Sequence, residues 1–416
     1  MATTSGISKS WHYGYTIVIC CFLIMLVAVG LVMSCAGIFY RPVSQELGIE
    51  IGTFSIYMSL CFLFSTLTLT FAGRLMERYS ARWILTICSA VTGLTMAAMS
   101  VFTSVWEFYA AGIIFGVTLA FLMYLGFATM LNRWFKTRMG LFLGICSAGS
   151  GIGGMLFNPL AGYLITEYGW RNAYLVFGAM ILVLVTPVVG VFMRDYPKDK
   201  GLLPYGASSE DNIASSATMR SQDDGMDYSK AIRQPIFYGM ILFAFLINAT
   251  ATLNGFLPAF AQSVSFSIEE AAFIASGAMV GVTVGKVILG MINDRSPLWG
   301  VLVTTGFGSV GLLLLLLGHV SIYLSVFGGF LFGWAYAGVT VQTPILVRTV
   351  FGNKHYARIY GNVSMAIAIG GAVAASGWGL LADAIGFNDI LLAGITFLII
   401  SCVIGVVALK SEHKYV

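Results

Sequence analysis

The stretch SGAMVGVTVGKVILGMINDR, residues 276–295, holds a single lysine in a run that is otherwise uncharged until its last two residues. From Ala271 to Asn293, Lys286 is the only charged residue. A run of about 20 apolar residues can span the hydrocarbon core of a bilayer, which is about 30 Å thick, as a helix. The stretch therefore predicts a membrane-spanning helix that carries one buried cation.

The rest of the chain has the same apolar character. Of its 416 residues, 58% are hydrophobic and only 10% are charged, and the mean hydropathy is +0.88. This composition excludes a soluble globular protein. We predict an all-α, polytopic membrane protein whose twelve transmembrane helices lie at about 15–39, 51–72, 83–102, 105–131, 140–164, 173–193, 235–262, 267–292, 300–318, 322–347, 361–382 and 389–409.

The basic residues predict the orientation, because Lys and Arg are retained on the cytoplasmic side during insertion. With the N-terminus inside, 19 of the 22 Lys and Arg residues fall on cytoplasmic segments, and the opposite topology reverses this count. The first apolar run follows a polar start and lacks a clear small-residue cleavage site, so we expect no removable signal peptide. We expect a multi-pass protein of the cytoplasmic membrane with both termini in the cytoplasm.

One long hydrophilic segment divides the predicted helices six and six. It predicts an N-terminal bundle over 1–193, a cytoplasmic linker over 194–234 and a C-terminal bundle over 235–416. The halves resemble each other at an offset of about 217 residues, since Gly73 matches Gly290 and Gly169 matches Gly386. Such matches indicate an internal duplication, and two six-helix repeats are typical of transporters.

The loops after the second and eighth predicted helices repeat a glycine, an acid and a base. The first reads GRLMERYSARW and contains Arg74, Glu77 and Arg78, and the second contains Asp294 and Arg295. Charged pairs at helix ends can form in one conformation and break in another, so we interpret these residues as gating residues. The alternative is that they only retain the loops in the cytoplasm.

The chain resembles the major facilitator superfamily through its twelve predicted spans, its central linker and the paired GRLMER and GMINDR loops. The segment NRWFKTRMGLFLGICSAGSGIGG, residues 132–154, resembles the signature of the monocarboxylate porters and the oxalate/formate antiporters within it. The resemblance implies two six-helix bundles that transport a small solute by alternating access.

Lys286 is the first candidate for binding that solute. A charge at the centre of a membrane helix costs about 2.5–3.5 kcal/mol and needs a partner, and the predicted helices contain no Asp or Glu that could serve as one. Either a substrate carboxylate is the partner or the side chain bends toward the cytoplasm near Asp294. The resemblance favours the substrate, because this position matches the cation with which those porters hold a carboxylate.

The chain departs from those families at three positions. The porters have arginine where Lys286 stands, and monocarboxylate porters have an acid where this chain has Val282. The dicarboxylate antiporter has a second lysine where this chain has Ile367. A single cation suits one carboxylate better than two, and the missing acid argues against proton symport through an acid-base pair.

Uncharged polar residues supply the other candidates for the substrate site. The resemblance aligns Tyr124 and Tyr336 with aromatic residues that line the cavity of related porters, where a phenol hydroxyl can bond a carboxylate. Gln342 and Asn362 could bind a polar group of the substrate, and they could equally join helices, as could Asn248 and Asn254.

We therefore predict a secondary active or facilitative transporter of a small organic anion, a monocarboxylate such as lactate or pyruvate. The alternatives are a dicarboxylate or formate exchanger and an exporter of neutral compounds. The sequence has no HExxH, GxSxG or Cys/His cluster, so we expect neither an enzyme nor a metal site or other cofactor. We expect a monomer in the lipid bilayer with no nucleic-acid partner.

Overall fold

The computed structural model describes residues 12–135, 139–206, 226–318, 321–352 and 355–411, without the side chains of Glu77, Met139, Tyr356, Ala357 and Arg358. The described chain is almost entirely helical and contains no β-strand. The helices before residue 207, here called the first group, are α1 (Gly14–Leu23), the π-helix η1 (Ile24–Ser34), α2 (Ala36–Leu47), α3 (Ile51–Arg78), α4 (Ala81–Ala98), the 3-10 helix η2 (Met99–Val101), α5 (Val105–Leu119), the π-helix η3 (Ala120–Gly126), α6 (Phe127–Trp134), α7 (Met139–Met180), the π-helix η4 (Ile181–Val185), α8 (Thr186–Phe192) and the 3-10 helix η5 (Pro197–Lys200).

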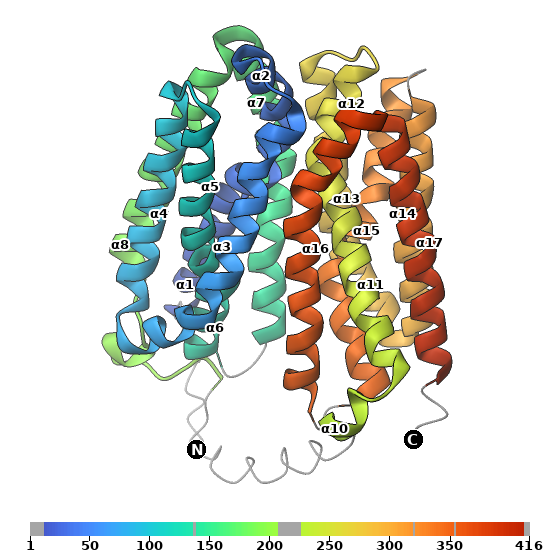
Figure 1. The fold of residues 1–416 in the computed structure, drawn as a ribbon. Helices are drawn as coiled ribbons and strands as arrows, with labels where there is room; N and C mark the ends of the chain where they lie inside the picture. Colours follow the sequence, from blue (N-terminus) through green and yellow to red (C-terminus); the bar gives the residue numbers. More distant parts are fainter. Residues whose placement is uncertain (1–11, 136–138, 207–225, 319–320, 353–354, 412–416) are drawn as a thin grey trace, which may run out of the picture.

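The helices after residue 225 form the second group. They are α10 (Tyr228–Ala231), α11 (Pro235–Ala251), the 3-10 helix η7 (Thr252–Phe256), α12 (Leu257–Ser263), α13 (Ile268–Arg295), α14 (Pro297–Leu317), α15 (Ile322–Phe351), α16 (Tyr356–Ile385) and α17 (Phe387–Ser411). Figure 1 shows the first group on the left and the second on the right, with most helices running between the same two sides. We call these the α10 side, which is lower in the figure, and the α12 side, which is upper.

Eleven segments of the described chain are long and apolar enough to cross a membrane. One of them, Leu141–Phe192, has 52 residues, which as a straight helix at about 1.5 Å per residue is more than twice the thickness of a hydrocarbon core. It is interrupted at Gly169, so it supplies two crossings. The predicted all-α fold with twelve transmembrane helices is confirmed, and the observed ends lie within a few residues of the predicted ones for most helices.

Gly169 and Gly386 turn the chain between consecutive helices with nearly the same backbone geometry. Gly169 has φ 81° and ψ 160°, and Gly386 has φ 95° and ψ 162°. Residues other than glycine rarely adopt these backbone angles. The match predicted from the repeat thus corresponds to the same turn in both groups.

Glycines also let helices approach within each group. A Cβ atom on Gly281 of α13 would collide with the carbonyl oxygen of Phe330 of α15, and one on Gly277 would lie 2.7 Å from that of Val326. Gly153 of α7 meets the backbone of η1 in the same way, at Leu26. These small residues therefore bring the backbones of neighbouring helices into contact.

Contacts between the two groups gather on the α12 side. The amide of Gly52, at the start of α3, donates a 2.6 Å hydrogen bond to Asp383, near the end of α16. A Cβ atom on Gly37 of α2 would collide with the carbonyl oxygen of Gly255 in η7. The ring of Tyr40 lies edge-on to that of Phe256, with the ring centroids 5.2 Å apart. The two groups are therefore closely packed on this side.

Asp383 corrects one prediction. The sequence analysis ended this helix at residue 382, one residue before Asp383, whereas α16 continues to Ile385 and includes this acid. The carboxylate lies at the α12-side end of the helix, where it accepts the Gly52 hydrogen bond.

Candidate functional site

A cavity of about 380 Å³ lies between the two groups of helices. Its lining comes from η1, α2, α3 and η3 in the first group and from α11, η7, α15 and α16 in the second. None of the described lining residues is charged, and methionine, aromatic and aliphatic side chains alternate with hydroxyl and amide groups. An apolar cavity of this size with a few polar groups is typical of a small-molecule site.

Each group contributes to the cavity a segment that departs from α-helical geometry. The π-helix η3 carries Met123 and Tyr124, and the 3-10 helix η7 carries Asn254, Gly255 and Phe256. π-Helical turns occur frequently at functional sites, and interrupted helices commonly line the binding sites of transporters. These two segments therefore support a ligand-binding site in the cavity, as an observation separate from the cavity volume.

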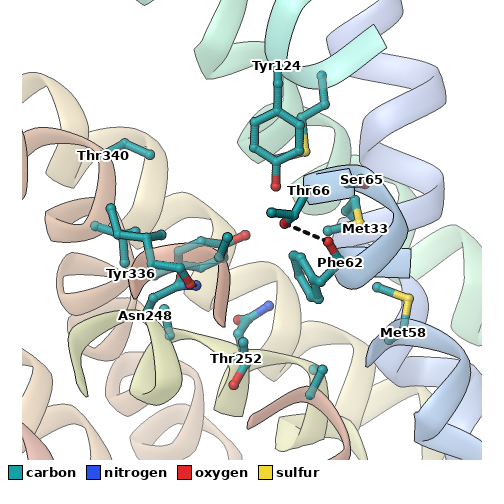
Figure 2. Close-up of a pocket in the computed structure, with 18 of the residues that line it drawn as sticks. Met33, Met58, Phe62, Ser65, Thr66, Tyr124, Asn248, Thr252, Tyr336 and Thr340 are labelled. Carbon is teal, nitrogen blue, oxygen red and sulfur yellow. Dashed lines mark hydrogen bonds between the residues drawn. The ribbon is translucent and has the colours of Figure 1, made fainter. Parts of the chain in front are cut away.

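Tyr124 and Tyr336 both line this cavity, from opposite groups of helices. Figure 2 shows Tyr124 on one side and Tyr336 on the other, with the Tyr124 hydroxyl pointing into the space between them. Tyr124 is 40% exposed, and within the described part of the chain no hydrogen bond joins either hydroxyl to a protein group. Both phenols are therefore available to a molecule in the cavity.

Two asparagines line the second-group side of the cavity. The Nδ2 atom of Asn248 donates a 2.7 Å hydrogen bond to the carbonyl of Ile367, so this amide joins α11 to α16. Asn254 is 7% exposed, and its Oδ1 atom is buried without a hydrogen-bond partner in the described structure. The two amides, which looked equivalent in the sequence, thus differ in what they have left to bond.

Lys286 is half-buried and is not among the residues that line the cavity. Its neighbour Gly285 packs against Trp334 and Ala337 of α15, which places Lys286 at the depth of Tyr336. Thr283 and Met279, three and seven residues earlier on the same helix face, contact Gly151 and Gly154 of α7. Lys286 therefore lies on the face of α13 that points toward the first group, and no ion pair joins it to any described acid.

Gln342 and Asn362 lie outside the cavity lining, and other protein groups engage their amides. Asn293 of α13 donates a 2.9 Å hydrogen bond to Gln342, whose own Nε2 atom donates to the carbonyl of Pro297 at 3.2 Å. The Nδ2 atom of Asn362 donates to the Tyr228 hydroxyl at 3.0 Å and so joins α16 to α10. The structure therefore does not bring these two residues together with Tyr124 and Tyr336.

The predicted gating residues lie at the α10-side ends of α3 and α13. Arg74, Arg78, Asp294 and Arg295 are exposed, and no ion pair joins them to other described residues. The side chain of Glu77 lies outside the described part of the chain. The pairs that the gating interpretation requires are therefore not formed among the side chains that the structure describes.

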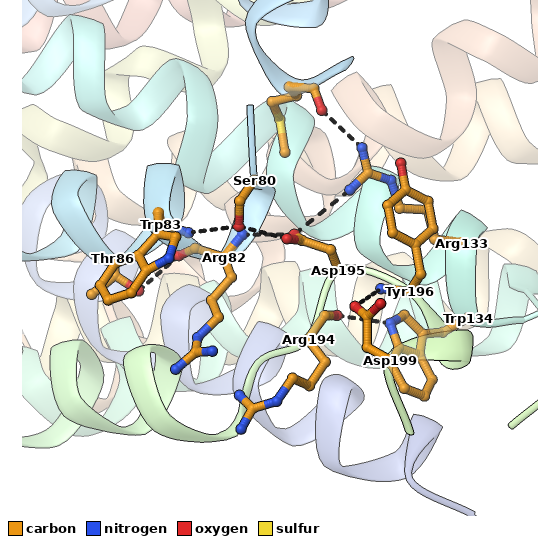
Figure 3. Close-up of polar contacts among 11 residues, drawn as sticks. Ser80, Arg82, Trp83, Thr86, Arg133, Trp134, Arg194, Asp195, Tyr196 and Asp199 are labelled. Carbon is orange, nitrogen blue, oxygen red and sulfur yellow. Dashed lines mark hydrogen bonds and ion pairs between the residues drawn. The ribbon is translucent and has the colours of Figure 1, made fainter. Parts of the chain in front are cut away.

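A different acid organises this end of the first group, and the sequence analysis did not single it out. Asp195, just after α8, accepts hydrogen bonds from the Ser80 hydroxyl at 2.5 Å and from the backbone amide of Arg82 at 2.9 Å (Figure 3). Its Oδ1 atom also lies 3.8 Å from a guanidinium nitrogen of Arg133. Asp195 therefore ties the start of α4 to the end of α6. The available signal was its position directly after an apolar run, beside Arg194.

Comparison with known proteins agrees with this architecture. The family model of the Major Facilitator Superfamily matches residues 20–267 and 239–415. A bacterial homologue of the human lysosomal transporter Spinster, solved in an inward-facing and occupied conformation, superposes with a TM-score of 0.71 at 14% identity, covering 97% of this chain and 98% of that one. The nucleoside transporter NupG has a TM-score of 0.69 at 14% identity, covering 98% of this chain and 100% of that one.

The curated relatives are more specific but cover less. Monocarboxylate transporter 12 of Xenopus laevis is 26% identical over 295 residues, which is 68% of this chain and 63% of the relative. Monocarboxylate transporter 4 of Gallus gallus is 27% identical over 183 residues, 44% of this chain and 38% of the relative. The matches to the first relatives thus span less than two thirds of their length. The chain belongs to the Major Facilitator Superfamily of membrane transporters and, within it, resembles the monocarboxylate transporters.

Proposed function

We propose that this transporter moves a small organic anion of the monocarboxylate class, which lactate and pyruvate represent, across the cytoplasmic membrane. Lys286 carries the proposal, because it is a cation at the depth of the cavity with no described acid to neutralise it. The resemblance to monocarboxylate transporters supports the same class. Tyr124 and Tyr336 supply hydroxyl groups to the bound carboxylate.

The transport cycle that we propose is alternating access. Residues 1–193 and 235–416 act as two domains, 194–234 connects them, and both termini are cytoplasmic. The α10 side is then the cytoplasmic side, so the contacts on the α12 side close the cavity toward the outside. In this interpretation the structure represents an inward-facing conformation, and Lys286 reaches the substrate when the domains tilt.

The uncharged lining of the cavity favours one other function, the export of neutral compounds. A binding screen on purified protein separates the two functions, with small carboxylates, their uncharged amides and small amines as ligands and thermal stability as the readout. The anion proposal requires that carboxylates raise the unfolding temperature more than their amides do. Equal effects of acid and amide would favour the neutral exporter, and stabilisation by dicarboxylates alone would favour the exchanger.

A further inference from the structure

We infer that the cavity binds a monocarboxylate with an aromatic body and a hydrogen-bonding group at the end remote from the carboxylate, and that Asn254 recognises this group. The inference rests on the proposed function for the position of the carboxylate. It goes beyond that function by naming the size and shape of the substrate and a residue that determines specificity.

Asn254 carries an unfilled hydrogen-bonding capacity. The residue is 93% buried, its Oδ1 atom has no partner, and within the described structure its Nδ2 atom has none either. Buried side-chain amides in folded proteins are nearly always hydrogen-bonded, because an unpaired polar group loses its bonds to water without replacement. The Nδ2 atom, unlike Oδ1, is not among the fully buried unpaired atoms, and Asn254 lines the cavity, so a ligand there can accept a hydrogen bond from this amide.

The depth of Asn254 gives the length of that ligand. Gly338 of α15, two residues beyond Tyr336, lies against Ile247 of α11. Asn254 is seven residues further along the same chain toward the α12 side, which at about 1.5 Å per residue is roughly 10 Å. Tyr336 and Lys286 share one depth, which is two residues nearer to Asn254 than Gly338, so the carboxylate end and the amide end of the site differ in depth by roughly 7 Å, a distance that a phenyl ring with a short side chain can span.

The region between these ends suits a flat apolar group. Met33, Met58, Phe62 and Phe256 belong to its lining. A cavity of about 380 Å³ lies in the size range of pockets for drug-sized ligands, so it leaves much empty space around lactate and has room for 3-(4-hydroxyphenyl)propionate. Aromatic rings also gain contact energy from methionine and aromatic neighbours.

The test uses full-length protein in proteoliposomes and measures competition against one labelled carboxylate. The competitors are lactate, 3-phenylpropionate, 3-(4-hydroxyphenyl)propionate and the amide of the last. We expect both aryl acids to compete better than lactate, and the hydroxylated acid about three- to tenfold better than the unsubstituted one, which corresponds to one hydrogen bond. This part needs no variant, so it does not depend on the folding of a mutant.

Asn254→Leu then tests the residue, because leucine is close in size and cannot form hydrogen bonds. We expect the preference for the hydroxylated acid to fall to about one while 3-phenylpropionate still competes. Asn172→Leu is the matched control, since Asn172 is exposed at the start of the helix after Gly169. We expect this variant to prefer the hydroxylated acid as strongly as the wild type does. A general packing defect would instead weaken both aryl acids equally and leave their ratio unchanged.

Two results would overturn the inference. Lactate competing as well as the aryl acids would exclude the aromatic substrate, and an unchanged ratio in Asn254→Leu would exclude the role of Asn254. Failure of the proposed function has a different signature, in which the uncharged amide competes as well as its acid.

Discussion

The backbone amide of Gly52 and the carboxylate of Asp383 join the two groups of helices by a hydrogen bond of 2.6 Å on the α12 side. Gly52 lies in the first turn of α3, where the exposed backbone N–H groups give the helix end a partial positive charge. Asp383 therefore stabilises the closed arrangement of this side both through a hydrogen bond and through its charge.

Asp383→Asn is predicted to loosen this closure. Loss of the charge at a helix N-terminus costs about 0.3–1 kcal/mol, so the open population should rise roughly two- to fivefold. Spin labels at Gln45 and Ser263, which are exposed on α2 and α12, report the separation of the groups. The same distance distribution in Asp383→Asn and in Asp389→Asn, an exposed acid at the start of α17, would contradict the prediction.

Lys286→Gln is predicted to abolish anion uptake while leaving membrane insertion and folding intact. Glutamine keeps much of the side chain's volume but removes the charge that a carboxylate needs in a medium of low dielectric constant. Lys286→Arg should retain part of the activity, because it keeps the charge with a different geometry. Uptake into proteoliposomes measures both variants, and uptake at the wild-type rate by Lys286→Gln would leave the lysine without a substrate role.

Tyr336→Phe is predicted to weaken binding of acids that carry a hydroxyl or keto group next to the carboxylate. Such acids can use the phenol as an additional partner, worth about 0.5–1.5 kcal/mol or roughly two- to twelvefold, whereas plain fatty acids cannot. A competition series of lactate and pyruvate against acetate measures the difference. Tyr323→Phe is the control, since Tyr323 is 85% exposed and lies outside the cavity, and it should leave the series unchanged.

Transport is predicted to proceed by exchange or facilitated diffusion rather than by obligatory proton symport. Val282 is buried where monocarboxylate porters carry an acid, and Asp383 is at the far end of a different helix. An imposed pH gradient should therefore not drive accumulation in proteoliposomes without counter-substrate. Accumulation that persists after correction for diffusion of the protonated acid would show that another group carries the proton.

Two glycines of α13 are predicted to respond in opposite ways to alanine. A Cβ atom at Gly281 meets the carbonyl of Phe330, so Gly281→Ala must push α13 and α15 apart and should lower the unfolding temperature of the purified protein. A Cβ atom at Gly290 meets nothing within 4 Å, so Gly290→Ala should be neutral or stabilise by up to about 1 kcal/mol. Equal unfolding temperatures would mean that the close helix contact does not limit stability.

The positions of the helices could be predicted from the sequence because hydropathy acts locally. Each span must be apolar over about 20 residues whatever its neighbours are, and the turns at Gly169 and Gly386 follow from residues that tolerate a positive φ. The π-helical and 3-10 segments were not predicted. They depend on packing between helices that are distant in the sequence, and no local pattern specifies them.

Only part of the candidate site could be predicted from the sequence, because the rest depends on packing between helices that are distant in the chain. Tyr124 and Tyr336 lie in the cavity lining, and their role there stays a prediction. Asn248 and Asn254 are the same residue type six positions apart, yet only Asn248 has a partner in the described chain. Which amide stays free depends on how α11 is rotated against α16 and on the end of α11 at η7. Neither feature can be predicted from the residue types alone.

The approach of Gly37 to Gly255 has a practical consequence for obtaining the opposite conformation. At this point main chain meets main chain, with no flexible side chain between the groups that could move aside. Tryptophan at position 37 would act as a steric wedge, and a wedge acts on shape alone, independently of charge, pH or ligand. In the orientation that we propose, a protein wedged in this way would be held in the outward-open state, in which the substrate can be captured from the other side of the membrane.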